Sequence, residues 1–250
     1  MTWLISVLAA LALLDSAAAA PETPCSVPES FLSADSDLTQ VAKDIKLHQR
    51  LDISVIGTGS SSLPGPDGAS FAYPAQLEQS LKQQLPNVTV KVTAHVQARE
   101  TTPSMAASLG TVLSEDKPAL VIWQAGTVDA MQAVDIEDFR ISLEHGIDAI
   151  QNHDADVILV NMQYSPRTEA MINVSNYADV MRIVAQQHGA VLFDRLGIMR
   201  DWSENGVFDL YAATNNYDMA RRVHACIGRG LASQIIAASH LDTRRTQTTE

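Results

Sequence analysis

The sequence predicts an α/β fold in which helices cover both faces of a parallel sheet. Two observations support this prediction: five short apolar runs typical of buried strands, and longer amphipathic segments of about ten to twenty residues between them. A third observation is that residues 51–240 show no linker, internal repeat or change of composition, which predicts one domain. In such sheets, ligands bind in the loops that follow the carboxyl ends of the strands.

The expected strands are short and rich in branched apolar residues. The second alternates apolar and polar side chains at period two, as a half-buried strand does, and the others are continuous apolar runs. They are Ile53–Ile56, Val88–Thr93, Ala119–Trp123, Asp156–Val160 and Ala190–Phe193.

The expected helices lie between these strands and after the last one. Apolar residues in them recur at the spacing of one helical face. They are Tyr73–Leu85, Met105–Leu113, Ile136–Asn152, Glu169–His188 and Asp218–Ser239. Residues 21–50 are expected to add an N-terminal arm and a helix. Residues 241–250 have no apolar periodicity and are expected to form a disordered tail.

Residues 1–20 have the pattern of a secretory signal peptide. The apolar run from Trp3 to Leu14 is too short to span a bilayer, and the small residues from Ser16 to Ala20 resemble a cleavage site. The alternative is an uncleaved N-terminal anchor. Export predicts a periplasmic or secreted protein that is not stably inserted in a membrane after cleavage.

The composition excludes several classes of function. With 17 Lys+Arg against 29 Asp+Glu, the net charge is -12, and no basic cluster is present to bind nucleic acid. No spacing of His, Cys, Asp and Glu resembles a metal site, and no cofactor is expected. The two cysteines, Cys25 and Cys226, leave two alternatives: a bridge between the N-terminal arm and the last helix, or two buried free thiols.

The loop after the first expected strand, from Gly57 to Gly68, is rich in glycine and serine. A Gly-x-Gly at this place is typical of dinucleotide sites, but the third glycine is missing and no acid closes the second strand. A second interpretation is a nucleophile loop, in which a serine after a tight turn aims its own N–H at a developing oxyanion. A plain polar turn is the third.

Together with later segments, this loop resembles an exported bacterial branch of the SGNH/GDSL hydrolases. In the first block, Ser61 would be the nucleophile and Ser60 replaces the usual aspartate. The matching segments are Gly59–Gly65, Val121–Val128 and Asp156–Pro166, and the paired cysteines near the two ends also match. The resemblance covers about residues 25–238. It implies a flavodoxin-like three-layer α/β/α sandwich with a five-stranded parallel sheet.

The resemblance also implies hydrolysis of an acyl ester on a polysaccharide or a small molecule. In that chemistry a serine attacks the ester carbonyl, a histidine takes its proton, and an aspartate orients the histidine. Backbone N–H groups of the serine and a second-block glycine, with a third-block asparagine, hold the oxyanion. Here Arg99 stands at the glycine position and Val128 at the asparagine position, two residues after Gly126.

The final Asp-x-x-His element matches least well. Alignment on Cys226 places Asn215 at the aspartate position and Asp218 at the histidine position. A carboxylate with an ordinary pKa is a poor base for a serine hydroxyl. His224, inside the last expected helix, is the nearest candidate base, and His95 at the end of the second strand is another.

Two acids near the expected site, Glu100 and Asp129, have two interpretations: they line the pocket, or they cap helices. For the protein as a whole, two functions follow. One is an ester hydrolase in which Ser61 is the nucleophile, His224 the base, and the N–H groups of Ser61 and Arg99 a reduced oxyanion hole. The other is an inactive relative that binds a carbohydrate or a protein through the same cleft.

Overall fold

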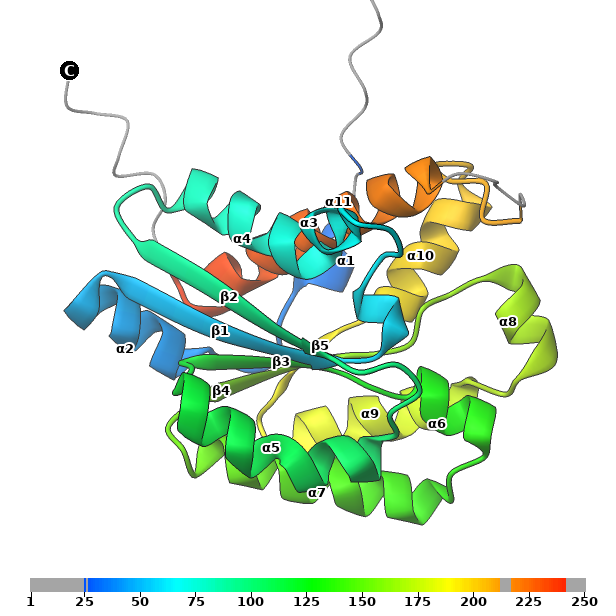
Figure 1. The fold of residues 1–250 in the computed structure, drawn as a ribbon, viewed down its shortest axis with the longest axis horizontal. Coiled ribbons are helices and arrows are strands. Elements are labelled where there is room, and N and C mark those ends of the chain that lie inside the picture. The colour runs from blue at the N-terminus through cyan, green and yellow to red at the C-terminus, as the bar shows by residue number, and fades with distance from the viewer. Residues whose placement is uncertain (1–24, 26, 212–216, 242–250) are drawn as a thin grey trace, which may run out of the picture.

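The computed structural model describes residues 25, 27–211 and 217–241, and these form a three-layer α/β/α sandwich (Figure 1). The predicted fold is therefore confirmed. Residues 1–24, 242–250 and Asn215, which carry the expected signal, tail and aspartate position, lie outside the described residues.

The central sheet contains five parallel strands in the order β2-β1-β3-β4-β5. Adjacent strands pair in register, with Ile53 opposite Leu120, and Leu120 opposite Asp156. This order places the chain reversal between β1 and β3, and ligands of such sheets bind outside the carboxyl ends at that point. The strands are β1 (Arg50–Gly57), β2 (Thr89–Val96), β3 (Leu120–Gln124), β4 (Asp156–Val160) and β5 (Val191–Phe193).

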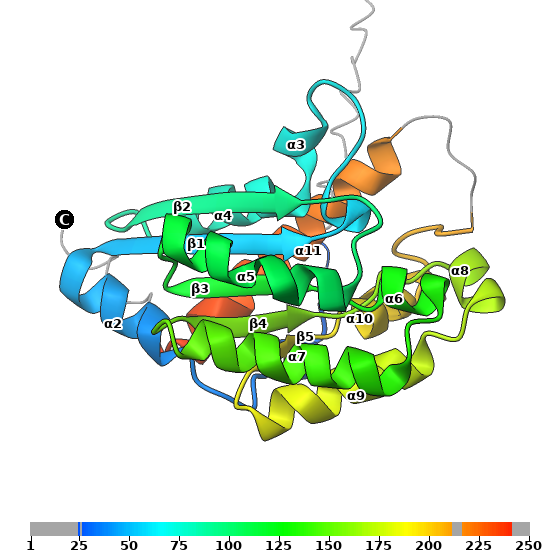
Figure 2. The same cartoon turned by 60° about the horizontal axis from the view of Figure 1, so that its bottom comes forward.

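Helices cover both faces of the sheet because residues 120–123 of β3 and residues 157–160 of β4 are apolar and completely buried (Figures 1 and 2). One face carries α4 (Tyr73–Gln84) and α11 (Asp218–Ala238), and the other carries α5 (Thr102–Asp116), α7 (Ile136–Gln151) and α9 (Ser175–Gln187). The remaining helices are α1 (Glu29–Leu32), α2 (Thr39–His48), α3 (Gly68–Phe71), α6 (Thr127–Gln132), α8 (Pro166–Met171) and α10 (Arg195–Glu204).

The expected helix from Glu169 to His188 is two helices, α8 and α9. Ile172 between them has extended backbone (φ -134°, ψ 140°), and the side chain of Asn173 accepts a hydrogen bond from Ser175 N at 3.2 Å. A local side-chain acceptor of this kind competes with continued helix, so α9 starts anew. The sequence analysis also missed α10, whose N-terminus is capped by Asp194 through the Gly197 N–H at 2.9 Å.

Helices α4 and α11 approach each other closely over the sheet. A Cβ built on Gly228 of α11 would lie 2.7 Å from Gln76 Cβ and 2.8 Å from Leu77 N of α4. Only glycine allows this approach, and it brings the first turn of α4 against the middle of α11. The contact places Tyr73 next to His224.

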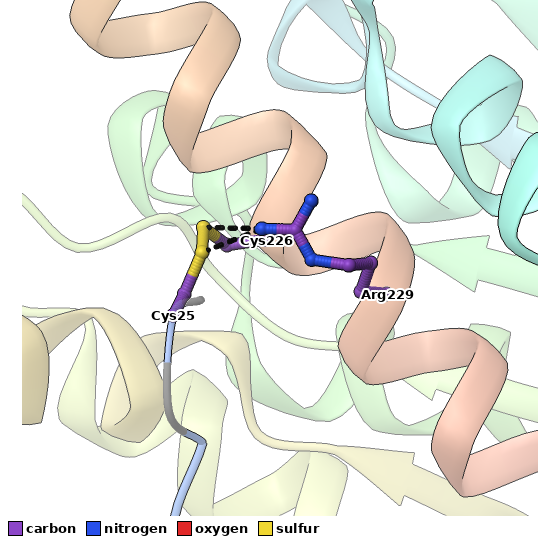
Figure 3. Close-up of a disulfide and its surroundings, with 3 residues drawn as sticks. All are labelled: Cys25, Cys226 and Arg229. Atoms are coloured by element: carbon purple, nitrogen blue, oxygen red, sulfur yellow. Dashed lines mark hydrogen bonds between the residues drawn. A yellow bond between two sulfur atoms is a disulfide. The ribbon is translucent and has the colours of Figure 1, made fainter. Parts of the chain in front are cut away.

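Of the two alternatives for the cysteines, the structure has the bridge: Cys25 and Cys226 form a disulfide with a Cα–Cα distance of 5.7 Å (Figure 3). It joins the N-terminal arm to α11. The guanidinium of Arg229, one turn further along α11, donates to Cys25 Sγ at 2.9 Å and to Cys226 Sγ at 3.5 Å. Over the described part of the chain, no helix is long and apolar enough to cross a membrane.

Candidate functional site

Ser61 ends a short 3₁₀ turn, Gly59–Ser61, directly after β1. The turn packs onto the end of the strand: a Cβ on Gly57 would lie 2.3 Å from Ser61 Oγ. Ser61 is 1% exposed, and its backbone N–H donates to Thr58 O at 2.8 Å. In this conformation, therefore, the N–H expected to face an oxyanion is bonded inside the turn.

The Ser61 hydroxyl is also fully engaged. It donates to Gln124 Oε1 at 3.0 Å and lies 3.0 Å from Tyr73 Oη. Because the serine proton points at Gln124, the tyrosine hydroxyl donates to Ser61 Oγ. Both neighbours thus hold the serine oxygen as a neutral hydroxyl.

Gln124, the last residue of β3, organises this end of the sheet. Its Oε1 accepts from Thr58 N (3.1 Å), Thr58 Oγ1 (3.2 Å), Ser60 Oγ (3.0 Å) and Ser61 Oγ. A backbone N–H can only donate, so the bond from Thr58 N fixes the orientation of the amide. The half-buried Ser60, expected near the oxyanion, therefore contributes its hydroxyl to this network.

His224 lies in the second turn of α11 and is 4% exposed. Its Nδ1 accepts a hydrogen bond from Tyr73 N at 3.0 Å, and the two rings lie 6.0 Å apart. Burial, helped by the charge of Arg195, lowers the pKa of His224 to about 3. The neutral ring therefore carries its proton on Nε2. Nδ1, the only ring nitrogen with a free lone pair in this form, already accepts the hydrogen bond from Tyr73 N.

In the structure, Tyr73 stands between the two expected catalytic residues in the hydrogen-bond network. Among the residues that the structure describes, no hydrogen bond joins Ser61 to His224, and Tyr73 contacts both. Tyr73 is fully buried, and burial raises the pKa of its hydroxyl. The arrangement is a hydroxyl pair beside a neutral imidazole.

Arg195, the first residue of α10, is a member of this network that sequence reasoning missed. It is 0% exposed, and it donates to Ser60 O at 3.1 Å and to Gln163 Oε1 at 3.2 Å. Its guanidinium lies 5.7 Å from the centre of the Tyr73 ring. Burial lowers the pKa of Arg195 to about 10, so it is charged at neutral pH. Its position two residues after β5, at a strand end, was the available signal.

Arg99, at the glycine position of the second block, is exposed and has φ 64°. This left-handed conformation is the one glycine adopts without strain, so the backbone retains a glycine-like shape around an arginine side chain. The Arg99 carbonyl accepts a hydrogen bond from Gln132 Nε2 of α6 at 3.1 Å.

Asp129 caps helices, which was one of the two roles considered for it from the sequence. Its carboxylate is 0% exposed and accepts from Thr102 N (2.7 Å), Thr102 Oγ1 (2.9 Å) and Gly126 N (3.0 Å). It therefore ties the first turn of α5 to the start of α6. Gly126 has φ +94°, and a Cβ there would lie 2.4 Å from Met162 Sδ. Val128, in α6, is half-buried.

His95 and Glu100 form hydrogen bonds with residues outside the serine network. His95 Nε2 contacts Asp116 Oδ2 at 2.6 Å, and Asp116 also accepts from Ser54 at 2.6 Å. Glu100 accepts from Ser104 Oγ at 3.0 Å. Asp218 is the exposed first residue of α11. Within the described residues, no group of three or more His, Cys, Asp or Glu could hold a metal ion.

Solved structures with a similar fold include two esterases and an α/β hydrolase. A two-domain esterase active on acetylated mannans aligns with a TM-score of 0.68 and 13% identity, over 88% of this chain and 58% of its own. Axe2, an acetylxylan esterase from Geobacillus stearothermophilus, aligns with a TM-score of 0.59 and 14% identity, over 79% and 97%. LAE5, an α/β hydrolase from the Lake Arreo metagenome, aligns with a TM-score of 0.58 and 18% identity, over 76% of this chain and 95% of its own.

These likenesses, with the strand order and the serine turn after β1, define an SGNH-hydrolase type of fold. The non-GDSL lipase-like family matches residues 24–241, and the chain belongs to that family. The family description agrees with Ser60 at the position where the GDSL pattern has aspartate. A search of curated protein sequences finds no match.

Proposed function

We propose that this protein binds an acylated carbohydrate at the side of the sheet where the strands end, and that it does not hydrolyse the ester. One observation carries the second half of this proposal: the Ser61 hydroxyl is buried and donates to Gln124, while His224 accepts from a backbone N–H instead. Serine hydrolysis needs a base within hydrogen-bond reach of the hydroxyl. Neither Gln124 Oε1 nor a tyrosine hydroxyl of raised pKa is such a base.

Exposed aromatic side chains support the choice of ligand. Tyr211 is 66% exposed, and its carbonyl accepts a hydrogen bond from Arg167 of α8 at 3.5 Å. Tyr217 is 51% exposed and directly precedes α11, which begins at the end of the molecule toward which the strands run (Figure 1). Phe71 is 37% exposed and lies 4.2 Å from the guanidinium of Arg221 in the first turn of α11. Exposed rings with an apolar face and a polar edge suit the alternating C–H and hydroxyl faces of sugars.

The likeness to solved esterases supports an acyl ester as part of the ligand. Solved relatives of this shape act on acetylated mannans and on acetylxylan, and this suggests acylated polysaccharide or a small acyl ester for this chain. Residues 1–20 and the disulfide support binding in a periplasmic or secreted location, where disulfides persist.

Hydrolysis by Ser61 is the second candidate function, favoured by the position of the serine in the turn after β1. It requires the turn to open, so that the Ser61 hydroxyl and N–H leave Gln124 and Thr58. It also requires a base. His224 could serve only after its Nδ1 gives up the hydrogen bond from Tyr73 N, and otherwise another residue must take this role. Val128 supplies no oxyanion donor, and the loss of one such donor costs on the order of 10²–10³ in rate.

An activity assay separates the two functions. We expect wild-type protein to cleave p-nitrophenyl acetate no faster than buffer, and a fluorophosphonate probe to leave Ser61 unlabelled. Ser61→Ala is compared with Ser62→Ala, the adjacent half-buried serine whose Oγ contacts only Leu63 O at 3.5 Å. Turnover in the wild type that is lost in Ser61→Ala and kept in Ser62→Ala would establish the hydrolase instead.

A binding assay tests the ligand. Acetylated xylo- and manno-oligosaccharides are titrated calorimetrically against the protein, with the deacetylated sugars as ligand controls. Tyr211→Ala and Tyr217→Ala should each weaken binding about tenfold, the effect of losing a well-placed aromatic contact. Leu47→Ala, which removes a 62% exposed apolar side chain from α2, should leave affinity unchanged. Equal affinity in all variants would place the sugar elsewhere.

A further inference from the structure

Arg195 is a fully buried cation that has no carboxylate partner in the part of the chain that the structure describes. The nearest acid in sequence, Asp194, directs its carboxylate elsewhere: Oδ1 accepts from Asn161 Nδ2 at 2.7 Å and from Gly197 N at 2.9 Å. Burying an isolated charge costs far more free energy than burying a neutral polar group. The fold therefore retains the Arg195 charge without neutralising it.

The groups around Arg195 are neutral. They are the Ser60 carbonyl, the Gln163 amide oxygen and the ring of Tyr73. His224 is neutral as well, because its pKa lies near 3. These dipoles stabilise a positive charge without supplying a negative one. The network as a whole carries one net positive charge.

Two buried N–H donors in the same network have no acceptor among the described protein atoms: Arg195 Nε and Gln124 Nε2. Ser60 links the two side chains through their other polar atoms: its hydroxyl donates to Gln124 Oε1 at 3.0 Å and its carbonyl accepts from Arg195 Nη1 at 3.1 Å. A buried donor without an acceptor is costly, and Gln124 is 0% exposed, as Arg195 is.

The acceptors of the network are already used. Gln124 Oε1 receives four donors, Ser61 Oγ receives the Tyr73 hydroxyl, and His224 Nδ1 receives Tyr73 N. Donors and positive charge are thus both in excess. A water molecule would satisfy the donors and leave the charge, whereas an anion satisfies both.

We propose that this network is a binding site for a small monovalent anion, a halide or a short carboxylate such as acetate, held at the buried, unpaired Nε–H of Arg195. The site is independent of carbohydrate binding on the outer surface. It stabilises the fold by neutralising Arg195.

Thermal unfolding at constant ionic strength tests the site. Chloride, bromide or acetate is exchanged for gluconate, which is too large for a buried site, and the expected result is a saturable rise in Tm for the small anions only. Comparing the titration with chloride and the titration with acetate shows whether a halide or a carboxylate binds more tightly. Arg182→Met, which removes an exposed arginine paired with Asp179, is the control and should show the same rise.

Two variants locate the effect. Arg195→Met should abolish the saturable rise. Gln124→Glu retains an oxygen for the donors now bonded to Oε1, and its second oxygen brings a negative charge into the network. It should fold, lose the anion dependence, and match the anion-saturated wild type in Tm. Gln124→Glu thus gives a clear result even if Arg195→Met does not fold.

Crystals grown in bromide provide a structural test. An anomalous peak within hydrogen-bond distance of Arg195 Nε supports the proposal. Bromide found only at surface arginines, or a wild-type Tm that is the same in chloride and gluconate, overturns it and assigns the two donors to water. A Gln124→Glu variant that keeps the wild-type anion dependence overturns it as well.

Discussion

Replacing His224 with asparagine is expected to make the protein less sensitive to mild acid. In the folded protein the ring is buried and its Nδ1 accepts from Tyr73 N. Asparagine places an oxygen near the position of Nδ1, so it keeps this hydrogen bond but cannot take up a proton. The substitution therefore removes one titrating group and retains its acceptor.

The size of the effect follows from the pKa of the ring. It is about 3 in the folded protein and 6.5 in the unfolded chain, so the unfolded state binds more protons between these two values. The stabilisation is present above pH 6.5 and is lost as the pH falls toward 3. Each pH unit in this window costs about 1.4 kcal/mol, and the cost between pH 7 and pH 5 is about 2 kcal/mol.

The measurement is urea unfolding followed by circular dichroism across this pH range. His224→Asn should be less stable than the wild type at neutral pH, because packing of the ring is lost, but the difference should shrink by about 2 kcal/mol by pH 5. Other titrating groups are common to both proteins and cancel. His153→Asn, at an exposed histidine, is the control. If the difference between wild type and His224→Asn stays constant with pH, the ring takes up its proton as readily in the folded state as in the unfolded chain, and the lowered pKa of His224 is refuted.

Two further predictions concern the backbone and the disulfide. Arg99→Gly should raise the free energy of unfolding by about 1 kcal/mol, because glycine removes the strain of φ 64°. Arg99→Ala should leave the free energy of unfolding unchanged, because alanine has the same strain as arginine. Equal stability of the two variants in chemical denaturation would show that the backbone at residue 99 is not strained. Cys226→Ser should lower the free energy of unfolding by up to about 5 kcal/mol, because the bridge closes a separation of 201 residues. Calorimetry should show the same loss for Cys25→Ser, and an unchanged Tm in either variant would contradict it.

Much of the sheet could be predicted from local pattern. The run Asp156–Val160 is β4 to the residue, because a buried parallel strand needs continuous apolar side chains and this run supplies them. Helix α10 was missed although it buries Ile198 and Trp202, since its capping acid, Asp194, looks like any polar residue after a strand. Helix starts depend on which acceptor faces the first N–H groups, and a single sequence does not reveal this.

The loop after β1 that carries Ser61 could be predicted from the sequence, but the hydrogen bonds of Ser61 could not. Ser61 lies where a nucleophile is expected, yet its partner Gln124 comes from another strand, 63 residues away. Arg195 is 135 residues from Ser60, and arginine is normally exposed, so its burial depends on acceptors that only the folded chain brings together. Long-range polar contacts of this kind have no local signature.

The bridge between Cys25 and Cys226 turns most of the chain into a covalent ring. A single protease cut in an exposed loop, such as Pro64–Asp67, would leave two peptides still joined through sulfur. Refolding of such a nicked molecule would remain a unimolecular event, independent of protein concentration. A surface break in this protein would therefore not separate the two parts of the chain on either side of it.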